Sequence, residues 1–164
     1  MLLEGSCHCG AVRFSVSSAH PYPFNLCYCS ICRKTAGSGG YAINLSADYE
    51  TLAVEGQDNI TVYRAKVHDD ATGEIFQSRC ERSFCGQCGS ALWVWSSEWP
   101  ELLHPFASAL DTPLPKPLER THLMAASKAP WVEVRTDPRD KTFDGYPDES
   151  IAQWHQRLGV EDRD

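Results

Sequence analysis

The sequence predicts a mainly β protein built from antiparallel sheets, with one short helix near the C-terminus. Three observations lead to this prediction. Short segments in which apolar and polar residues alternate recur along the chain, and a period of two is typical of half-buried strands. Segments rich in glycine, asparagine and aspartate separate them, as expected for turns. Eight cysteines, gathered in short clusters, add constraints on where the strands meet.

Five segments are expected to form strands. The clearest covers residues 11–17, where apolar side chains alternate with polar ones. The other four expected strands cover residues 41–45, 60–64, 75–79 and 91–95. Turn compositions lie between them, at residues 37–40, 56–59 and 70–73. Strand, turn and strand at this spacing indicate an antiparallel arrangement.

The second half of the chain is less regular. Prolines recur through residues 99–117, so backbone donors are missing there, and we expect this stretch to wrap the sheets without forming a regular helix. Residues 148–158 are expected to be helical, capped by Asp148 or Ser150. Their apolar side chains recur at a spacing of three to four, at Ile151, Trp154 and Leu158. Residues after Gly159 are charged and are expected to fray.

Length and composition narrow the class of protein. A chain of 164 residues fits one hydrophobic core, so we expect a single domain over residues 1–164. The formal net charge of −7 argues against nucleic acid as the main partner, because such binders usually carry a basic face. The first residues do not resemble a secretory signal, and no stretch approaches the ~18 apolar residues of a membrane span. We expect a cytoplasmic protein whose thiols stay reduced.

The cysteines are the most informative residues. Residues 7–9 read C-H-C and residues 27–32 read C-Y-C-S-I-C, and thiols two residues apart on an extended chain point to one face. Residues 85–89 read C-G-Q-C-G, in which a turn presents both thiols and Gly89 permits a positive φ after the second one. Pairs of this kind are suited to bind one ion together.

Counting ligands divides these cysteines between two zinc ions. Structural zinc is held by four thiolates at ~2.3 Å, often from two short pairs that are distant in sequence. The first and last clusters predict such a closed site, which would tie together the strands near Val12 and Leu92; its ligands are Cys7, Cys9, Cys85 and Cys88. The middle cluster supplies only three ligands, Cys27, Cys29 and Cys32. Three protein ligands and one exchangeable position are typical of zinc that takes part in chemistry.

Other uses of the cysteines are less favoured. C-x-C pairs bridge poorly to each other and a reducing compartment opposes disulfides. A redox dithiol, Cys29 with Cys32 or Cys85 with Cys88, would leave the additional C-x-C partners unexplained. For the eighth cysteine, Cys80, three roles remain open. The first is a fourth ligand, which would make the second site structural. The second is a thiol of the core without a role at the metal. The third is a reactive thiol near an open metal position.

The motifs around these cysteines resemble a known family. Residues 5–12 (G-S-C-H-C-G-A-V), 27–34 (C-Y-C-S-I-C-R-K) and 82–89 (R-S-F-C-G-Q-C-G) are similar in order and spacing to the glutathione-dependent formaldehyde-activating enzymes, also called the centromere protein V family. Similar features follow downstream, at Leu110-Asp111, Pro117, His122 and residues 128–131. The resemblance covers about residues 3–134 and leaves residues 135–164 as a C-terminal extension.

This resemblance implies a β-tent-like fold of coiled antiparallel sheets with two zinc ions. It implies a structural ion on Cys7, Cys9, Cys85 and Cys88 and a catalytic ion on Cys27, Cys29 and Cys32, which is the division that ligand counting gives. Formaldehyde-activating members read C-G-C-T-K-C-W-K at the segment that holds the catalytic ion. The corresponding residues 27–34 of this chain keep the three cysteines and the lysine but differ at the positions between them. The resemblance therefore implies carbon–sulfur chemistry on a thiol adduct and names no electrophile.

We accordingly expect a zinc-dependent carbon–sulfur lyase, or a related enzyme, that acts on an adduct of glutathione or another small thiol. Arg33 and Lys34 follow the last ligand and either pair with a substrate carboxylate or form an exposed basic pair. His122 is an acid–base candidate, or else a buried structural histidine. Aromatic residues either wall a pocket or fill the core, and these are Tyr41, Phe84, Trp93, Trp95 and Trp131.

Two other functions stay open at this point. One is a zinc-stabilised binding module in which both ions are structural, and the number of zinc ions and of ligands at the middle cluster would distinguish it. The other is nucleic-acid or cytoskeletal binding by analogy with centromere-associated relatives, against which the net charge of −7 weighs.

Overall fold

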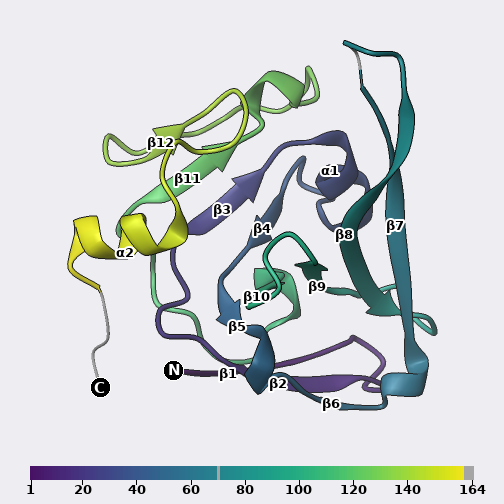
Figure 1. The fold of residues 1–164 in the computed structure, drawn as a ribbon. Coiled ribbons are helices and arrows are strands. Elements are labelled where there is room, and N and C mark those ends of the chain that lie inside the picture. The colour runs from purple at the N-terminus through teal and green to yellow at the C-terminus, as the bar shows by residue number, and fades with distance from the viewer. Residues whose placement is uncertain (70, 161–164) are drawn as a thin grey trace.

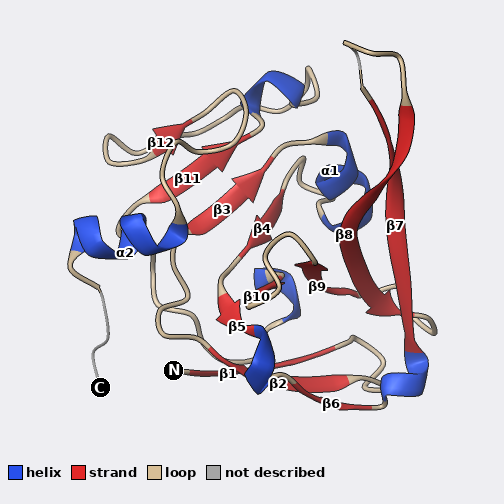
Figure 2. Ribbon diagram, in the orientation of Figure 1, coloured by secondary structure: helices blue, strands red, loops and turns tan. Residues whose placement is uncertain are grey.

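A computed structural model describes residues 1–69 and 71–160, and it shows a mainly β chain with three sheets (Figure 1). Helical segments are short and lie between or after the strands (Figure 2). The predicted fold class, mainly β with one short helix near the C-terminus, is confirmed. Within the described residues no helix is long and apolar enough to cross a membrane.

The first sheet holds three antiparallel strands in the order β1-β2-β6: β1 (Leu2–Ser6), β2 (Arg13–Ser17) and β6 (Ala53–Glu55). The alternation in the sequence explains β2, because Phe14 and Val16 are buried while Arg13 is exposed. Gly5 in β1 is needed for close packing, since a Cβ there would lie 2.4 Å from the Phe14 ring and 2.5 Å from the Ala109 carbonyl oxygen.

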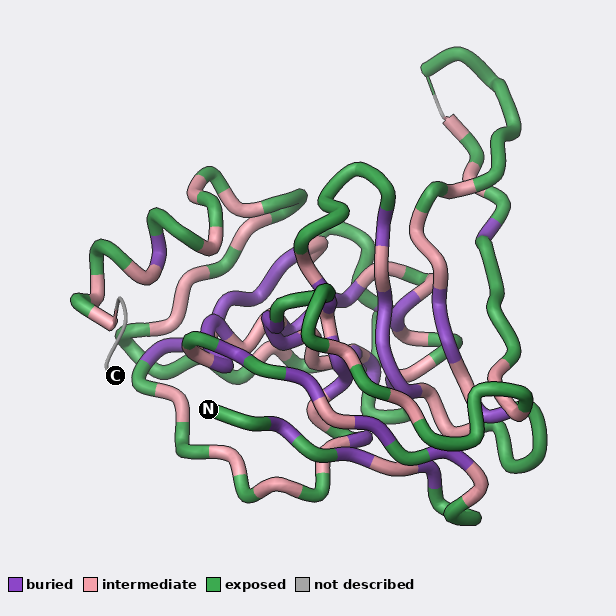
Figure 3. Tube along the Cα trace, turned by 60° about the horizontal axis from the view of Figure 1, so that its bottom comes forward, coloured by how far each residue is buried: buried purple, intermediate pink, exposed green. Residues whose placement is uncertain are grey.

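The second sheet holds five antiparallel strands in the order β5-β10-β9-β8-β7. They are β5 (Ala47–Asp48), β7 (Ile60–His68), β8 (Ile75–Cys85), β9 (Ala91–Ser96) and β10 (Leu102–Pro105). Strands β7 and β8 form the long hairpin whose exposed end projects from the body (Figure 3). The turn expected at residues 70–73 falls partly on Asp70, which lies outside the described residues.

The third sheet has the order β12-β11-β3-β4: β3 (Phe24–Cys27), β4 (Ala42–Asn44), β11 (Arg120–Leu123) and β12 (Lys141–Thr142). Strand β11 pairs parallel to both β3 and β12, which the antiparallel expectation did not include. Parallel pairing requires a long crossover, and the chain between β3 and β11 supplies one. The alternation of residues within a strand does not show whether a strand distant in sequence pairs parallel or antiparallel to it.

Within residues 1–69 and 71–160, two α-helices complete the fold. The expected helix is α2 (Ile151–Leu158), and Ser150 is its N-cap, with Gln153 closing a capping box. Helix α1 (Ser30–Ala36) was not expected, because its seven residues are too few to show helical periodicity. Four short 3₁₀ turns also occur, at Tyr49–Thr51, Gln57–Asn59, Ala107–Ala109 and Ala125–Ser127. Of the residues after Gly159 that are expected to fray, 161–164 lie outside the described part.

The proline-rich stretch is only partly irregular. It contains β10, where Pro105 occupies the last position of the strand. Beyond β10 it wraps the first sheet, since Asp111 donates its backbone N–H to the Glu4 carbonyl oxygen at 2.8 Å. The main core lies between the sheets, where the Phe14 and Trp93 rings meet edge to face at 5.0 Å.

Candidate metal centres and the cavity beside them

Cysteines from the first and second sheets meet in one cluster of four. The sulfur atoms lie within 4.8 Å of one another, and they belong to Cys7, Cys9, Cys85 and Cys88. The first pair follows β1 and the second stands at the end of β8 and in the turn after it. Two of the residues are buried and two are exposed, so the cluster lies at the surface where the sheets join.

The two halves of this cluster have similar loops. The Gly10 N–H bonds to the Cys7 carbonyl oxygen at 3.0 Å, and the Gly89 N–H bonds to the Cys85 carbonyl oxygen at 2.8 Å. Both glycines have a positive φ, 76° and 74°, which glycine adopts without strain. Residues 7–9 therefore form a turn and not the extended segment that the C-x-C spacing suggested. The positive φ expected at Gly89 is present.

These sulfurs fit a tetrahedral ion. Four sulfurs ~2.3 Å from one centre would lie about 3.8 Å apart. The sulfur atoms of Cys7 and Cys9 are 3.5 Å apart, and those of Cys9 and Cys85 are 3.8 Å apart. The Val12 N–H donates to the Cys7 sulfur at 3.2 Å, and the Ser90 hydroxyl lowers the pKa of the Cys88 thiol to about 5. The cluster is therefore suited to a thiolate-bound metal ion.

The second cluster contains three cysteines from one short segment, whose sulfurs also lie within 4.8 Å of one another. Cys27 ends β3, Cys29 is the N-cap of α1 and Cys32 lies in its first turn. The Cys32 N–H donates to the Cys29 sulfur at 3.3 Å, in the way that a cap side chain satisfies a free donor at a helix start. Strand, cap and helix together turn three side chains toward one point.

Crowding controls the charge of this cluster. Hydrogen bonds from Cys27 and Cys32 lower the pKa of Cys29 to about 2. Contacts with Cys29 and Cys32, together with burial, raise the pKa of Cys27. Without a cation, the Cys29 thiolate therefore accepts hydrogen bonds from the neighbouring thiols. All three cysteines can be thiolates together only if a positive charge compensates them. Metal binding with release of protons satisfies that requirement.

A cavity of about 470 Å³ opens onto the three-cysteine cluster, within the ~300–1,000 Å³ of small-molecule sites. Strands of the second and third sheets form two of its walls. Residues 146–151 and Trp154, from the C-terminal part of the chain, form another. Tyr146 lines the cavity while 68% exposed, so it lies at the mouth. The four-cysteine cluster contributes no residue to the lining.

Cys80 lines this cavity but stands apart from the three-sulfur cluster, which does not include it. Of the three roles left open for Cys80, the role of fourth ligand is not supported by this arrangement. A half-buried thiol in the wall of the cavity fits the geometry.

Two residues that were not expected at the site from the sequence line the cavity, Arg82 and His104. Arg82 on β8 is buried, and its Nη2 lies 4.0 Å from the Cys32 sulfur. His104 on β10 bonds through Nδ1 to the Leu45 carbonyl oxygen at 2.9 Å, and burial lowers its pKa. Arg82 could have been noticed from its place in the 82–89 motif. No sequence signal marks His104, because only the pairing of β10 with β9 and β5 brings it to the cavity.

Three of the residues expected near the substrate do not line the cavity. Arg33 and Lys34 are in α1, and neither lines the cavity. His122 is 1% exposed and also outside the lining, with Nδ1 bonded to the Tyr28 hydroxyl at 2.8 Å and Nε2 bonded to Asp140 at 3.3 Å. Because Tyr28 stands between Cys27 and Cys29, His122 supports the back of the ligand-bearing segment. The five aromatic residues considered from the sequence do not line the cavity. The aromatic side chains that do are Trp99, Tyr146 and Trp154.

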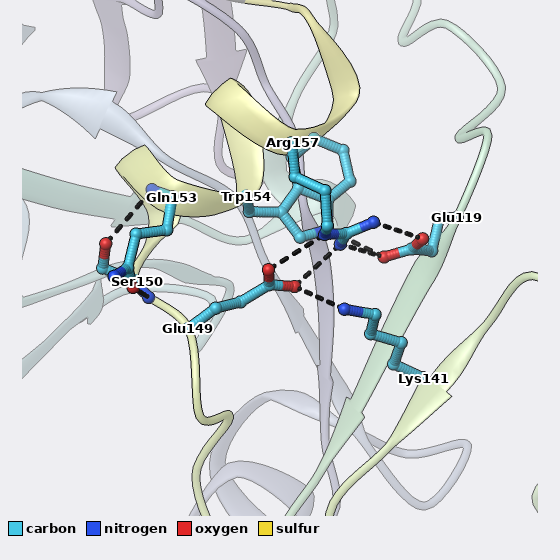
Figure 4. Close-up of polar contacts among 7 residues, drawn as sticks. All are labelled: Glu119, Lys141, Glu149, Ser150, Gln153, Trp154 and Arg157. Carbon is cyan, nitrogen blue, oxygen red and sulfur yellow. Dashed lines mark hydrogen bonds and ion pairs between the residues drawn. The ribbon is translucent and has the colours of Figure 1, made fainter.

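An ionic network, shown in Figure 4, holds the C-terminal wall in place. Arg157 on α2 bonds to Glu119 at 2.7 Å and to Glu149 at 2.7 Å, and Lys141 on β12 bonds to Glu149 at 3.0 Å. Trp154 is 2% exposed and donates its indole N–H to Glu119 at 3.1 Å. We call these five residues the C-terminal clasp. Glu149 and Trp154 also line the cavity, so the clasp and the cavity share a wall.

Comparisons with known proteins agree with these observations. Residues 2–126 match the family model described as glutathione-dependent formaldehyde-activating enzyme. A Halomonas elongata protein that carries the name of a glutathione-dependent formaldehyde-activating enzyme is 62% identical over 162 residues, which cover 99% of each chain. A crystal structure of a Rhodobacter sphaeroides protein matches with a TM-score of 0.52 and 27% identity, covering 68% of this chain and 91% of that one.

Proposed function

Because this chain belongs to the glutathione-dependent formaldehyde-activating enzyme family, we propose that it makes and cleaves a carbon–sulfur bond between glutathione and a small aldehyde. The observation that carries this proposal is the cluster of three cysteine sulfurs opening into a cavity of about 470 Å³. A site that lacks a fourth protein sulfur and adjoins a cavity has room for a substrate thiol. This reaction class is that of a carbon–sulfur lyase.

The two clusters would hold two zinc ions, since thiolate sets of this kind favour zinc in proteins. We assign the structural ion to Cys7, Cys9, Cys85 and Cys88 and the second to Cys27, Cys29 and Cys32. When bound, the second ion would lower the pKa of the substrate thiol and act as a Lewis acid. The residues of the chain would bind the substrate, exclude water and carry its proton.

In the synthetic direction the thiol sulfur forms a bond to the carbonyl carbon, and the carbonyl oxygen takes up the proton that the thiol loses. In the other direction the hydroxyl proton leaves as the carbon–sulfur bond breaks. We assign the proton transfer to His104. Its Nδ1 donates to the Leu45 carbonyl oxygen, so the neutral ring keeps a lone pair on Nε2, and its lowered pKa keeps it neutral near pH 7.

Exchange spectroscopy by NMR tests the proposal directly. Glutathione and formaldehyde exchange slowly with their adduct without a catalyst, and catalytic amounts of the zinc-loaded chain should accelerate that exchange at least about tenfold. Cys32→Ser should abolish the acceleration, whereas Arg79→Gln, an exposed change outside the cavity, should preserve it. Acetaldehyde in place of formaldehyde then tests how narrow the carbonyl specificity is.

The alternative of a non-catalytic binding module predicts a different outcome. In that case the zinc-loaded chain would leave the exchange rate unchanged, and X-ray absorption would report four protein sulfurs on each ion. Three sulfurs and one lighter atom on one ion, together with faster exchange, support the enzyme.

A further inference from the structure

Arg82 has an unusual position for a charged residue. It is 8% exposed, and its side chain leaves β8 toward the cavity, where one terminal nitrogen approaches the Cys32 sulfur at 4.0 Å. Its neighbours in the register are Cys80 two residues earlier and Val94 across the strand pair, and both line the same cavity. The backbone thus fixes Arg82 on the inner face of the second sheet.

Most of the hydrogen-bonding capacity of Arg82 is unused. Its Nε and Nη1 atoms are buried and have no hydrogen-bond partner among the described residues. Burying a guanidinium without partners is unfavourable, because arginine stays charged and loses its hydration. Of the described residues that line the cavity, Arg82 is the only lysine or arginine. Its acidic companions in the lining are Asp148, which is exposed, and Glu149, which is paired with Arg157 and Lys141 in the C-terminal clasp.

We propose that Arg82 binds a carboxylate of the thiol substrate inside the cavity. This inference rests on the proposed function and adds to it the part of the substrate that is recognised. A carboxylate supplies an acceptor for Nη1, which lacks one, and the two terminal nitrogens of a guanidinium bind a carboxylate in a fixed planar geometry. The contact with Cys32 places that recognition beside the three-sulfur cluster. Arg82 thereby replaces Arg33 and Lys34 as the carboxylate-binding group.

The experiment compares two thiols that differ in one group. 3-Mercaptopropionate carries a carboxylate, and 3-mercaptopropionamide has the same length with a neutral amide. Calorimetric titration of the zinc-loaded chain should give tighter binding of the carboxylate by at least about tenfold. Arg82→Gln should remove that preference by lowering affinity for 3-mercaptopropionate and not for the amide. Arg82→Lys should retain part of it, because the charge remains while the planar fork is lost.

Matched variants separate this proposal from its competitors. Arg79→Gln, on the same strand and exposed, should leave both affinities unchanged. The proposal would be wrong if Arg33→Gln removed the preference for the carboxylate and Arg82→Gln did not. It would also be wrong if Arg82→Gln lowered the affinity for both thiols equally while the chain kept two zinc ions. The wild-type chain also tests it without any risk of misfolding, since equal affinity for the two thiols contradicts it. Wild-type protein that binds neither thiol would instead overturn the proposed function and this inference together.

Discussion

Single residues decide how much a metal ion at each cysteine cluster would contribute to folding. Cys7 and Cys85 are 2% and 0% exposed and lie where two sheets meet, so an ion held there joins segments far apart in sequence. Cys27, Cys29 and Cys32 come from one continuous segment. An ion at the second cluster therefore closes only a short loop and contributes less to the stability of the whole chain.

The first prediction compares one serine substitution in each cluster. Cys85→Ser should leave the chain unfolded or insoluble, because structural zinc supplies folding free energy directly. Cys32→Ser should lose one zinc ion per chain and the exchange activity while keeping a cooperative unfolding transition. Elemental analysis and circular dichroism measure both outcomes. Equal damage from the two substitutions would refute the division into a closed and an open site.

The second prediction concerns His122, which lies outside the cavity. His122→Ala should destabilise the chain by about 2–4 kcal/mol, because it leaves the buried Tyr28 hydroxyl without its partner and removes one of the hydrogen bonds to the Asp140 carboxylate. Chemical denaturation measures this change, and His68→Ala at an exposed position of β7 is the control. The preference for 3-mercaptopropionate over its amide should persist in His122→Ala. Loss of that preference with unchanged stability would place His122 at the substrate.

At the level of elements, the C-terminal segment is part of the site although the family model ends before it, at residue 126. Helix α2 is short and would be marginal alone. The clasp attaches it to Glu119, directly before β11, and to Lys141 of β12, and the same attachment positions the wall formed by residues 146–151. Arg157 is central to this arrangement, since it bonds both glutamates, and they raise its pKa.

The third prediction tests this attachment. Arg157→Met should lower stability by about 1–3 kcal/mol and should expose the segment after residue 140 to limited proteolysis, because Glu119 and Glu149 lose their common partner. Affinity for glutathione should fall with it, as measured by calorimetry. Arg139→Met, which breaks only an exposed pair with Asp137, is the matched control and should behave as the wild type. A protected segment in Arg157→Met would show that Trp154 suffices to hold the helix.

At the level of the whole molecule, the two metal clusters differ in what surrounds them. The four-cysteine cluster lies at the surface where two sheets join and contributes nothing to the cavity lining, while the three-cysteine cluster faces the cavity. An ion at the second cluster is consequently reachable by a small molecule without separation of the sheets.

The fourth prediction follows from this difference. A chelator should remove zinc in two phases, with one ion per chain lost before the fold changes and the other lost together with it. Glutathione at ~100 times its dissociation constant should slow the first phase by about 100-fold, since an occupied fourth position stabilises the bound ion by mass action. Absorbance of a chelating dye and circular dichroism follow the two events. A single phase that glutathione does not affect would contradict an open second site.

The sequence by itself determined the local features of this protein. Alternation placed β2, β4, β7, β8 and β9, and the apolar spacing with Ser150 placed α2, because each depends on neighbours within a few residues. Cysteine spacing marked the two short pairs and the triplet for the same reason, since a turn such as residues 85–89 is a local structure. Counting ligands then joined the two distant pairs, whose sulfurs lie together in the structure. The family could also be identified from these motifs.

Only the tertiary structure decided which residues share the cavity. Strands β10 and β11 have no marked periodicity, and their pairing partners bring His104 to the cavity and turn His122 away from it. Arg33 directly follows Cys32 and Arg82 lies two residues after Cys80, yet only Arg82 lies on the inner face of a sheet. Residues 146–151 reach the cavity because Glu149 bonds to Lys141 and because Glu119 holds the helix that follows them. Which residues line the cavity depends on packing between segments that are distant in sequence. The pattern of residues within any one segment does not encode that packing.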